Sequence, residues 1–108
     1  MNSADGQTYE LKSVVDTGYT GWLTLPPDVI SKLGLAWRER GGATLADGSQ
    51  TLFNVYNATV IWDGRSVVIP VDEIDADPLV GMSLMYGYEL HLPIIDGAIF
   101  TLSIINNI

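Results

Sequence analysis

The stretch Val-Val-Asp-Thr-Gly at residues 14–18 decides how this chain is interpreted. Its two β-branched residues favour an extended strand, and Gly18 permits a tight turn directly after it. The pattern predicts a strand that delivers the carboxylate of Asp16 onto a turn at the end of a packed sheet. Taken alone, the tripeptide also fits an aspartate that only caps its own turn. The rest of the chain has to distinguish these two interpretations.

Length and charge limit the kind of molecule that carries this turn. The chain has 108 residues, of which 47% are apolar and 17% charged, and we expect residues 1–108 to form one globular domain. The formal net charge of −8 would repel nucleic acids and anionic membranes, so neither is an expected partner. No apolar run is long enough for a membrane helix, and the first residues lack a signal-peptide pattern. We therefore expect a cytoplasmic location.

Asp-Gly pairs, which suit the positive φ angles of tight hairpin turns, predict a chain built from hairpins. The four pairs are Asp5-Gly6, Asp47-Gly48, Asp63-Gly64 and Asp96-Gly97. The segments between them are rich in β-branched and aromatic residues, and we expect strands at residues 9–15, 53–62, 66–71, 88–95 and 98–105. Only four residues precede Asp5-Gly6, so a first strand is expected to be missing at the N-terminus.

Helix signals are scarce and short. Residues 27–33 have proline at the first helical position and Gly34 where a C-terminal cap would lie. Val29, Ile30 and Leu33 would form the buried stripe of this helix. A second short helix is predicted at residues 82–86. The predicted class is therefore mainly β, with one or two short helices.

Several kinds of chemistry are excluded by composition. The chain has no cysteine and one histidine, so it lacks the residues of a usual zinc site and of a cysteine nucleophile. A serine triad would have to use His91 as its base, and His91 lies in an apolar stretch between Leu90 and Leu92. His91 is expected to be a strand residue with a local partner. Gly41-Gly42 lacks the Lys-Ser/Thr pair of a phosphate loop. The acidic run is predicted to be a solvated loop, with a weak cation site as the alternative, since it does not have the calcium-loop spacing. Its members are Asp72, Glu73, Asp75 and Asp77.

Three motifs in a fixed order favour the catalytic interpretation of the aspartate. They are Asp16-Thr17-Gly18, the hairpin turn Asp47-Gly48-Ser49, and Leu79-Val80-Gly81 before the second short helix. This order resembles the single-domain retropepsin-like aspartic proteases over residues 14–102. Within that family, the motifs are similar to a bacterial and cyanobacterial subgroup of clan AA.

The resemblance implies a closed retropepsin-like β-barrel and an aspartic endopeptidase that works as a homodimer without a cofactor. Each subunit would contribute one Asp16 to a shared pair of carboxylates. Thr17 would hydrogen-bond across the interface, and Gly18 would let the substrate backbone approach closely. The hairpin at Asp47, Gly48 and Ser49 would be a flap that binds a peptide or protein substrate. Residues 79–81 would form a buried loop that supports the Asp-bearing turn.

Some features leave alternatives open. Tyr19 follows the Asp-Thr-Gly triplet, where the viral enzymes usually carry a small residue. Trp22, Leu23 and Val80 would either line substrate pockets or pack in the core. The strand at residues 100–108 would either form an interface sheet or pack inside its own domain. A non-catalytic β domain of the same fold, used for binding or assembly, is the main competing hypothesis, and an unrelated all-β domain with coincidental motifs is the third.

Overall fold

The fold was analysed in a computed structural model, which describes residues 7–62, 64–85, 97 and 99–107. Within this part of the chain there are seven strands and two helices. In chain order they are β1 (Thr8–Val15), β2 (Leu23–Leu25), α2 (Pro27–Leu33), β3 (Ala36–Thr44), β4 (Gln50–Trp62), β5 (Arg65–Glu73), β6 (Leu79–Val80), α3 (Met82–Met85) and β7 (Ile99–Ile105). The predicted class, mainly β with short helices, is confirmed.

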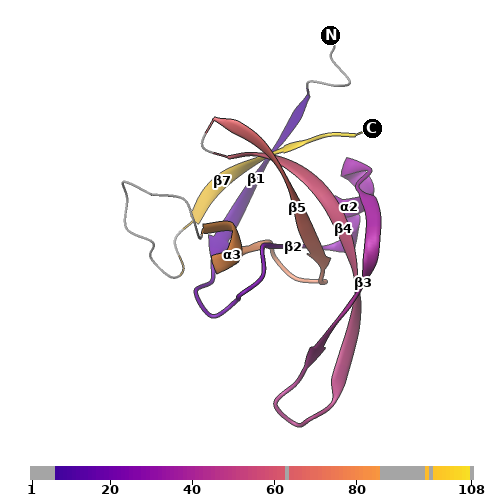
Figure 1. The fold of residues 1–108 in the computed structure, drawn as a ribbon. Coiled ribbons are helices and arrows are strands. Elements are labelled where there is room, and N and C mark those ends of the chain that lie inside the picture. The colour runs from indigo at the N-terminus through magenta and orange to yellow at the C-terminus, as the bar shows by residue number, and fades with distance from the viewer. Residues whose placement is uncertain (1–6, 63, 86–96, 98, 108) are drawn as a thin grey trace.

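The strands form one sheet with the order β3-β4-β5-β2-β6-β1-β7. β4 also pairs with β7, where Val60 lies opposite Ile104 and Ile61 lies opposite Ser103. The pairings that lead from β4 to β7 therefore return to β4 and form a ring (Figure 1). β3 lies outside this ring and pairs only with β4 among the described strands. The family-specific barrel shape stays a prediction.

A single hydrophobic cluster fills the ring. On β1 the side chains alternate as a half-buried strand requires: Leu11 and Val15 are buried, and Lys12 is exposed. Other strands contribute fully buried side chains, which are Leu23, Leu25, Val60, Ile69, Val71, Val80, Leu102 and Ile104. Each such side chain stabilises the fold by about 1.5–3 kcal/mol relative to its exposed state. The sheet end that carries Asp16 therefore rests on a packed core.

Helix α2 forms as the sequence predicts. Pro27 occupies the first turn, and Gly34 ends the helix in the left-handed conformation with φ 64°. The Gly34 N–H donates to the Ser31 carbonyl at 3.1 Å. Ile30 and Leu33 are buried, so the expected apolar stripe packs on the core.

The structure describes the glycine in three of the four predicted Asp-Gly turns. Gly48, Gly64 and Gly97 have φ angles of 88°, 75° and 83°, which favour glycine. The first two lie in the β3–β4 and β4–β5 connections, and Gly97 precedes β7. The Asp5-Gly6 turn, the strand at residues 88–95 and His91 lie outside the described residues.

The C-terminal strand packs inside its own domain, which is the second of its two predicted roles. β7 pairs with β1 along its whole length, from Thr8 opposite Ile105 to Val14 opposite Ile99. Its Leu102 side chain is buried in the core cluster. This strand therefore completes the sheet of its own domain. In the described part of the chain, no helix has the length and apolar character needed to cross a membrane.

Candidate active site

Asp16 leaves the end of β1 next to the short strand β6. β6 lies between β1 and β2, which are consecutive in the chain, and it runs parallel to β1 with Val15 opposite Val80. The Asp16 N–H donates to the Val80 carbonyl at 3.0 Å, and the Val14 N–H donates to the Pro78 carbonyl at 3.2 Å. Backbone hydrogen bonds thus fix the start of the turn to a neighbouring strand.

The turn closes on the aspartate itself. The Gly18 N–H donates to Asp16 Oδ1 at 2.9 Å, and the Tyr19 N–H donates to the Asp16 carbonyl at 3.1 Å. A Cβ at Gly18 would lie 3.3 Å from Asp16 Oδ1, so glycine leaves the carboxylate uncrowded. Asp16 is half-buried, whereas Thr17 and Gly18 are exposed. Because a carboxylate has two oxygens, the cap on Oδ1 is compatible with chemistry at Oδ2.

The predicted supporting motif at residues 79–81 lies against this turn. The Gly81 N–H donates to the Trp22 carbonyl at 3.0 Å, and the Met82 N–H donates to the Tyr19 carbonyl at 2.9 Å. A Cβ at Gly81 would collide with the Gly21 carbonyl oxygen. The structure therefore brings the first and third sequence motifs together, and their contact requires glycine at position 81.

Tyr19, the residue that departs from the viral pattern, has a polar partner far away in sequence. Its hydroxyl donates to Asp72 Oδ2 at 2.7 Å. Burial, followed by the hydrogen bond and the charge of Asp72, raises the pKa of the Tyr19 phenol above its ordinary value. Sequence reasoning missed this pair, because no local pattern relates residues 53 positions apart.

The same contact corrects part of the prediction for the acidic run. Asp72 and Glu73 are half-buried and end strand β5, because pairing with β2 and β4 extends that strand further than the sequence indicates. Asp75 and Asp77 are exposed in the following loop, as expected. Among the residues that the structure describes, no group of three or more acidic or histidine side chains could hold a metal ion.

The second motif lies at the tip of the β3–β4 hairpin, which extends well away from the sheet ring (Figure 1). The Ser49 N–H and hydroxyl both donate to Asp47 Oδ1, at 2.9 and 2.6 Å. These two bonds, the hydroxyl's first, lower the pKa of Asp47 below its ordinary value. The tip stands apart from the Asp16 turn in this structure. The predicted substrate-binding residues Asp47, Gly48 and Ser49 are therefore not gathered into one pocket with Asp16.

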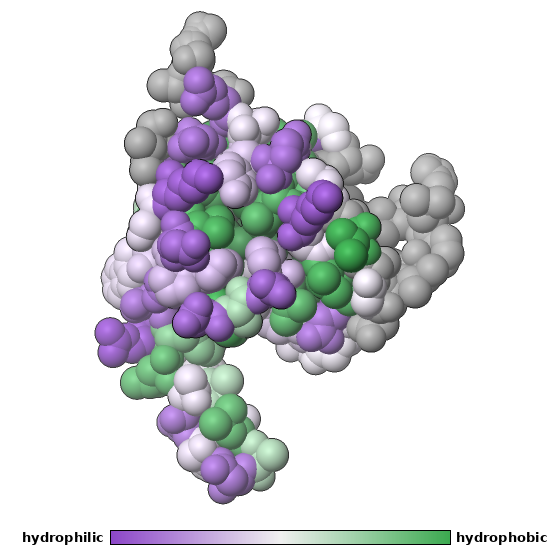
Figure 2. Space-filling view, turned by 180° about the vertical axis from the view of Figure 1, so that it is seen from behind, coloured by the Kyte–Doolittle hydropathy of each residue, from purple (hydrophilic) through white to green (hydrophobic). Residues whose placement is uncertain are grey.

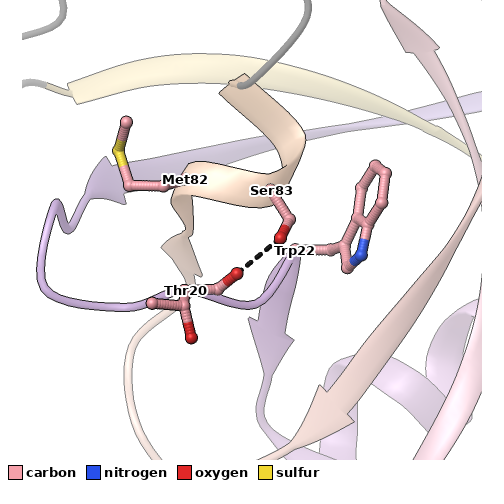
Figure 3. A pocket seen from close by; sticks show the side chains of 4 residues that line it. All are labelled: Thr20, Trp22, Met82 and Ser83. Atoms are coloured by element: carbon pink, nitrogen blue, oxygen red, sulfur yellow. Dashed lines mark hydrogen bonds between the residues drawn. The ribbon is translucent and has the colours of Figure 1, made fainter.

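An open pocket of about 300 Å³ lies beside the Asp16 turn (Figure 3). It is lined by Thr20, Trp22, Met82 and Ser83, and the Ser83 hydroxyl donates to the Thr20 carbonyl across it. Trp22 lines this pocket and also packs against the core cluster, so it combines features of the two expected roles. Leu23 and Val80 are fully buried and belong to the core.

Comparison of the sequence with protein-family models and curated proteins, and of the fold with solved structures, finds no match. Function therefore has to be argued from the chemistry of this chain's own residues.

Proposed function

We propose that this chain is one subunit of a homodimeric aspartic endopeptidase, with Asp16 as its catalytic carboxylate. The observation that carries the proposal is the setting of Asp16. Its half-buried carboxylate lies on a turn that backbone hydrogen bonds hold against Val80 and close through Gly18. A catalytic group needs such fixed geometry, because small displacements of the reacting atoms lower the rate strongly.

The reaction would use two Asp16 carboxylates, one from each subunit. Two carboxylates a few ångströms apart cannot both ionise readily, so they share one proton and titrate as a pair. The ionised member takes a proton from a water molecule that attacks the peptide carbonyl, and the protonated member donates a hydrogen bond to the carbonyl oxygen. The tetrahedral intermediate then breaks down as the amine leaves with a proton. Thr17, exposed beside Asp16, would hydrogen-bond across the subunit interface and orient the pair.

The β3–β4 hairpin would act as a flap over an extended peptide substrate. Nearly all of β3 is exposed, and the tip is held mainly by its own hydrogen bonds. Segments with few buried contacts open at low free energy, which suits a flap that must move for substrate entry. Figure 2 shows apolar side chains on this arm, and the exposed Leu45 and Leu52 are among them. These side chains would contact apolar parts of the substrate when the flap closes.

One observation favours the second candidate, a non-catalytic β domain for binding or assembly. β7, the strand expected to supply an interface sheet, is already paired with β1 and β4 inside the subunit. Because β4 pairs with only Ser103 and Ile104 of β7, a dimer would have to use the rest of that edge or another surface. Without a dimer, Asp16 would remain a turn cap bonded to Gly18.

The test is cleavage of a diverse peptide mixture between about pH 4 and 7. We expect the wild-type protein to cut and Asp16→Asn to be inactive with an unchanged fold. Asp75→Asn, which neutralises an exposed loop aspartate, is the matched control and should retain activity. Sedimentation of the same samples should show a dimer.

Cleavage that survives in Asp16→Asn would overturn the proposal, and so would a strictly monomeric, inactive wild-type protein. In the second case the binding domain becomes the better explanation. Asp16→Asn would then lower the free energy of unfolding by only about 1 kcal/mol or less, as expected for a lost turn cap.

A further inference from the structure

Tyr19 contacts the Asp16 turn, the β6–α3 junction and strand β5 at once. Its N–H bonds to the Asp16 carbonyl, and its own carbonyl accepts from the Met82 N–H. Its side chain reaches across to Asp72 near the end of β5. One residue therefore joins three parts of the molecule that meet at the candidate site.

The aromatic ring is held on both sides by glycines. A Cβ at Gly21 would lie 2.5 Å from Tyr19 Cζ, and a Cβ at Gly81 would lie 2.6 Å from Tyr19 Cδ2. These spacings mean that the ring occupies the space where side chains at both positions would begin. The ring therefore fills the gap between the turn and the β6–α3 junction, and it has little room to shift.

The hydroxyl has a strong acceptor at the far end of this packed ring. It lies 2.7 Å from Asp72 Oδ2 and 3.4 Å from the Leu23 carbonyl, so the carboxylate is the main acceptor. Hydrogen bonds to ionised acceptors are stronger than neutral ones. Asp72 itself is fixed in the sheet, opposite Thr24 on β2 and Val55 on β4. The bond thus ties a turn residue to a strand with partners on both sides.

We propose that Tyr19 is a positioning residue, whose bond to Asp72 fixes the Asp16 turn in the geometry that the carboxylate needs. The consequence for catalysis rests on the proposed protease function, whereas the effect on the turn does not. The same bond links the turn to β5, the neighbour of the flap strand β4. A small residue at position 19 could neither fill the gap between Gly21 and Gly81 nor bond to Asp72.

Two variants remove the bond from either end and keep the packing. Tyr19→Phe deletes the hydroxyl and retains the ring between the two glycines, and Asp72→Ala deletes the acceptor. Tyr56→Phe is the control for the first, because Tyr56 is a half-buried tyrosine packed on the same core. Asp75→Ala, in the exposed loop, is the control for the second.

The primary measurement is amide hydrogen exchange at Met82, whose N–H bonds to the Tyr19 carbonyl. We expect both variants to exchange there roughly tenfold faster, the factor that about 1.4 kcal/mol produces, with the Ile30 amide in α2 unchanged. The double variant should be no faster than either single one, because both remove the same bond. In peptide cleavage, kcat should fall roughly tenfold with little change in KM, since only the reacting geometry is altered.

Unchanged Met82 exchange, acceleration that is uniform across the protein, or additive effects in the double variant would each overturn the inference. Because exchange is measured on the folded protein without substrate, it decides the role of Tyr19 in holding the turn even if the wild-type protein cleaves nothing. An inactive wild-type protein with local, non-additive acceleration would refute the protease function and support the Tyr19–Asp72 link. A normal kcat in both variants of an active enzyme would show that the bond does not position the carboxylate.

Discussion

The Asp16 turn and the tip of the β3–β4 hairpin each contain an aspartate whose Oδ1 accepts from the N–H two residues later, yet the two turns are held in opposite ways. The first is bonded to β6 and α3 and packed against Tyr19. The second is closed mostly by its own bonds between residues 45 and 49, and it projects into solvent. The two turns have similar local sequences, so this difference comes from the elements that pack against each turn. Under the proposed function, the packed turn would form the floor of the site and the hairpin would be the segment that closes over the substrate.

The largest stability contrast should come from truncating one leucine in each region. Leu23→Ala removes a fully buried side chain below the Asp16 turn and should lower the free energy of unfolding by about 3 kcal/mol. Leu52→Ala removes a side chain that is 63% exposed on the hairpin and should change it by about 0.5 kcal/mol or less. Urea unfolding of both variants checks this. Similar losses in the two would mean that the hairpin is packed against something in solution.

A glycine pair gives the next contrast. Gly81→Ala places a methyl group against the Gly21 carbonyl and the Tyr19 ring, and should destabilise the protein by about 2 kcal/mol. Gly42→Ala on β3 meets the flexible end of Leu52 at 3.3 Å and the Thr51 carbonyl oxygen at an ordinary 3.6 Å, and should change stability by about 0.5 kcal/mol or less. Thermal unfolding of the two variants measures the difference. If Gly81→Ala were as stable as wild type, the turn and the β6–α3 junction could not be in the close contact described here.

The smallest expected effect is the response of the hairpin tip to low pH. The folded state lowers the pKa of Asp47, so its stabilising contribution is present above the ordinary value of 3.8 and is lost as the pH falls through the lowered folded pKa. Ser49→Ala removes the donating hydroxyl and should return the Asp47 pKa toward 3.8. Carboxyl titration by NMR checks this shift. We expect no measurable change in melting temperature at neutral pH, because the group is exposed; a lowered melting temperature there would show that the tip is coupled to the sheet.

The features that sequence predicted correctly are those with local signals. Proline and glycine at its ends mark helix α2, and Asp-Gly marks the turn between β3 and β4. Strand β3 was not expected as a strand, because its Arg-Glu-Arg-Gly-Gly stretch is a weak strand former. It forms by pairing with β4, for example Gly41 opposite Phe53. Such pairing depends on the partner strand, so a local pattern cannot reveal it.

The features of the candidate site also separate into those with a local sequence signal and those that depend on strand pairing. The position of Asp16 after a β-branched strand was readable, and so was the glycine of the supporting motif. The Tyr19–Asp72 bond was not, because it depends on how β2 and β5 align in the sheet. The separation of the hairpin tip from the Asp16 turn could not be predicted either. The motifs give the order and spacing of residues, but they do not determine the angle between the hairpin and the rest of the sheet.

The closure of the strand ring by β7 has a consequence for how the protein is made. Thr8 lies opposite Ile105, so the two ends of the described chain meet in one antiparallel pair. During synthesis β1 can pair with β6 before β7 has emerged, but its antiparallel partner β7 is the last strand of the described chain. Contacts between segments so far apart in sequence slow folding, because the loop between them must close before the contacts form. Until β7 is in place, an edge of β1 and the end of β4 lack this partner, and such open edges favour association with other chains.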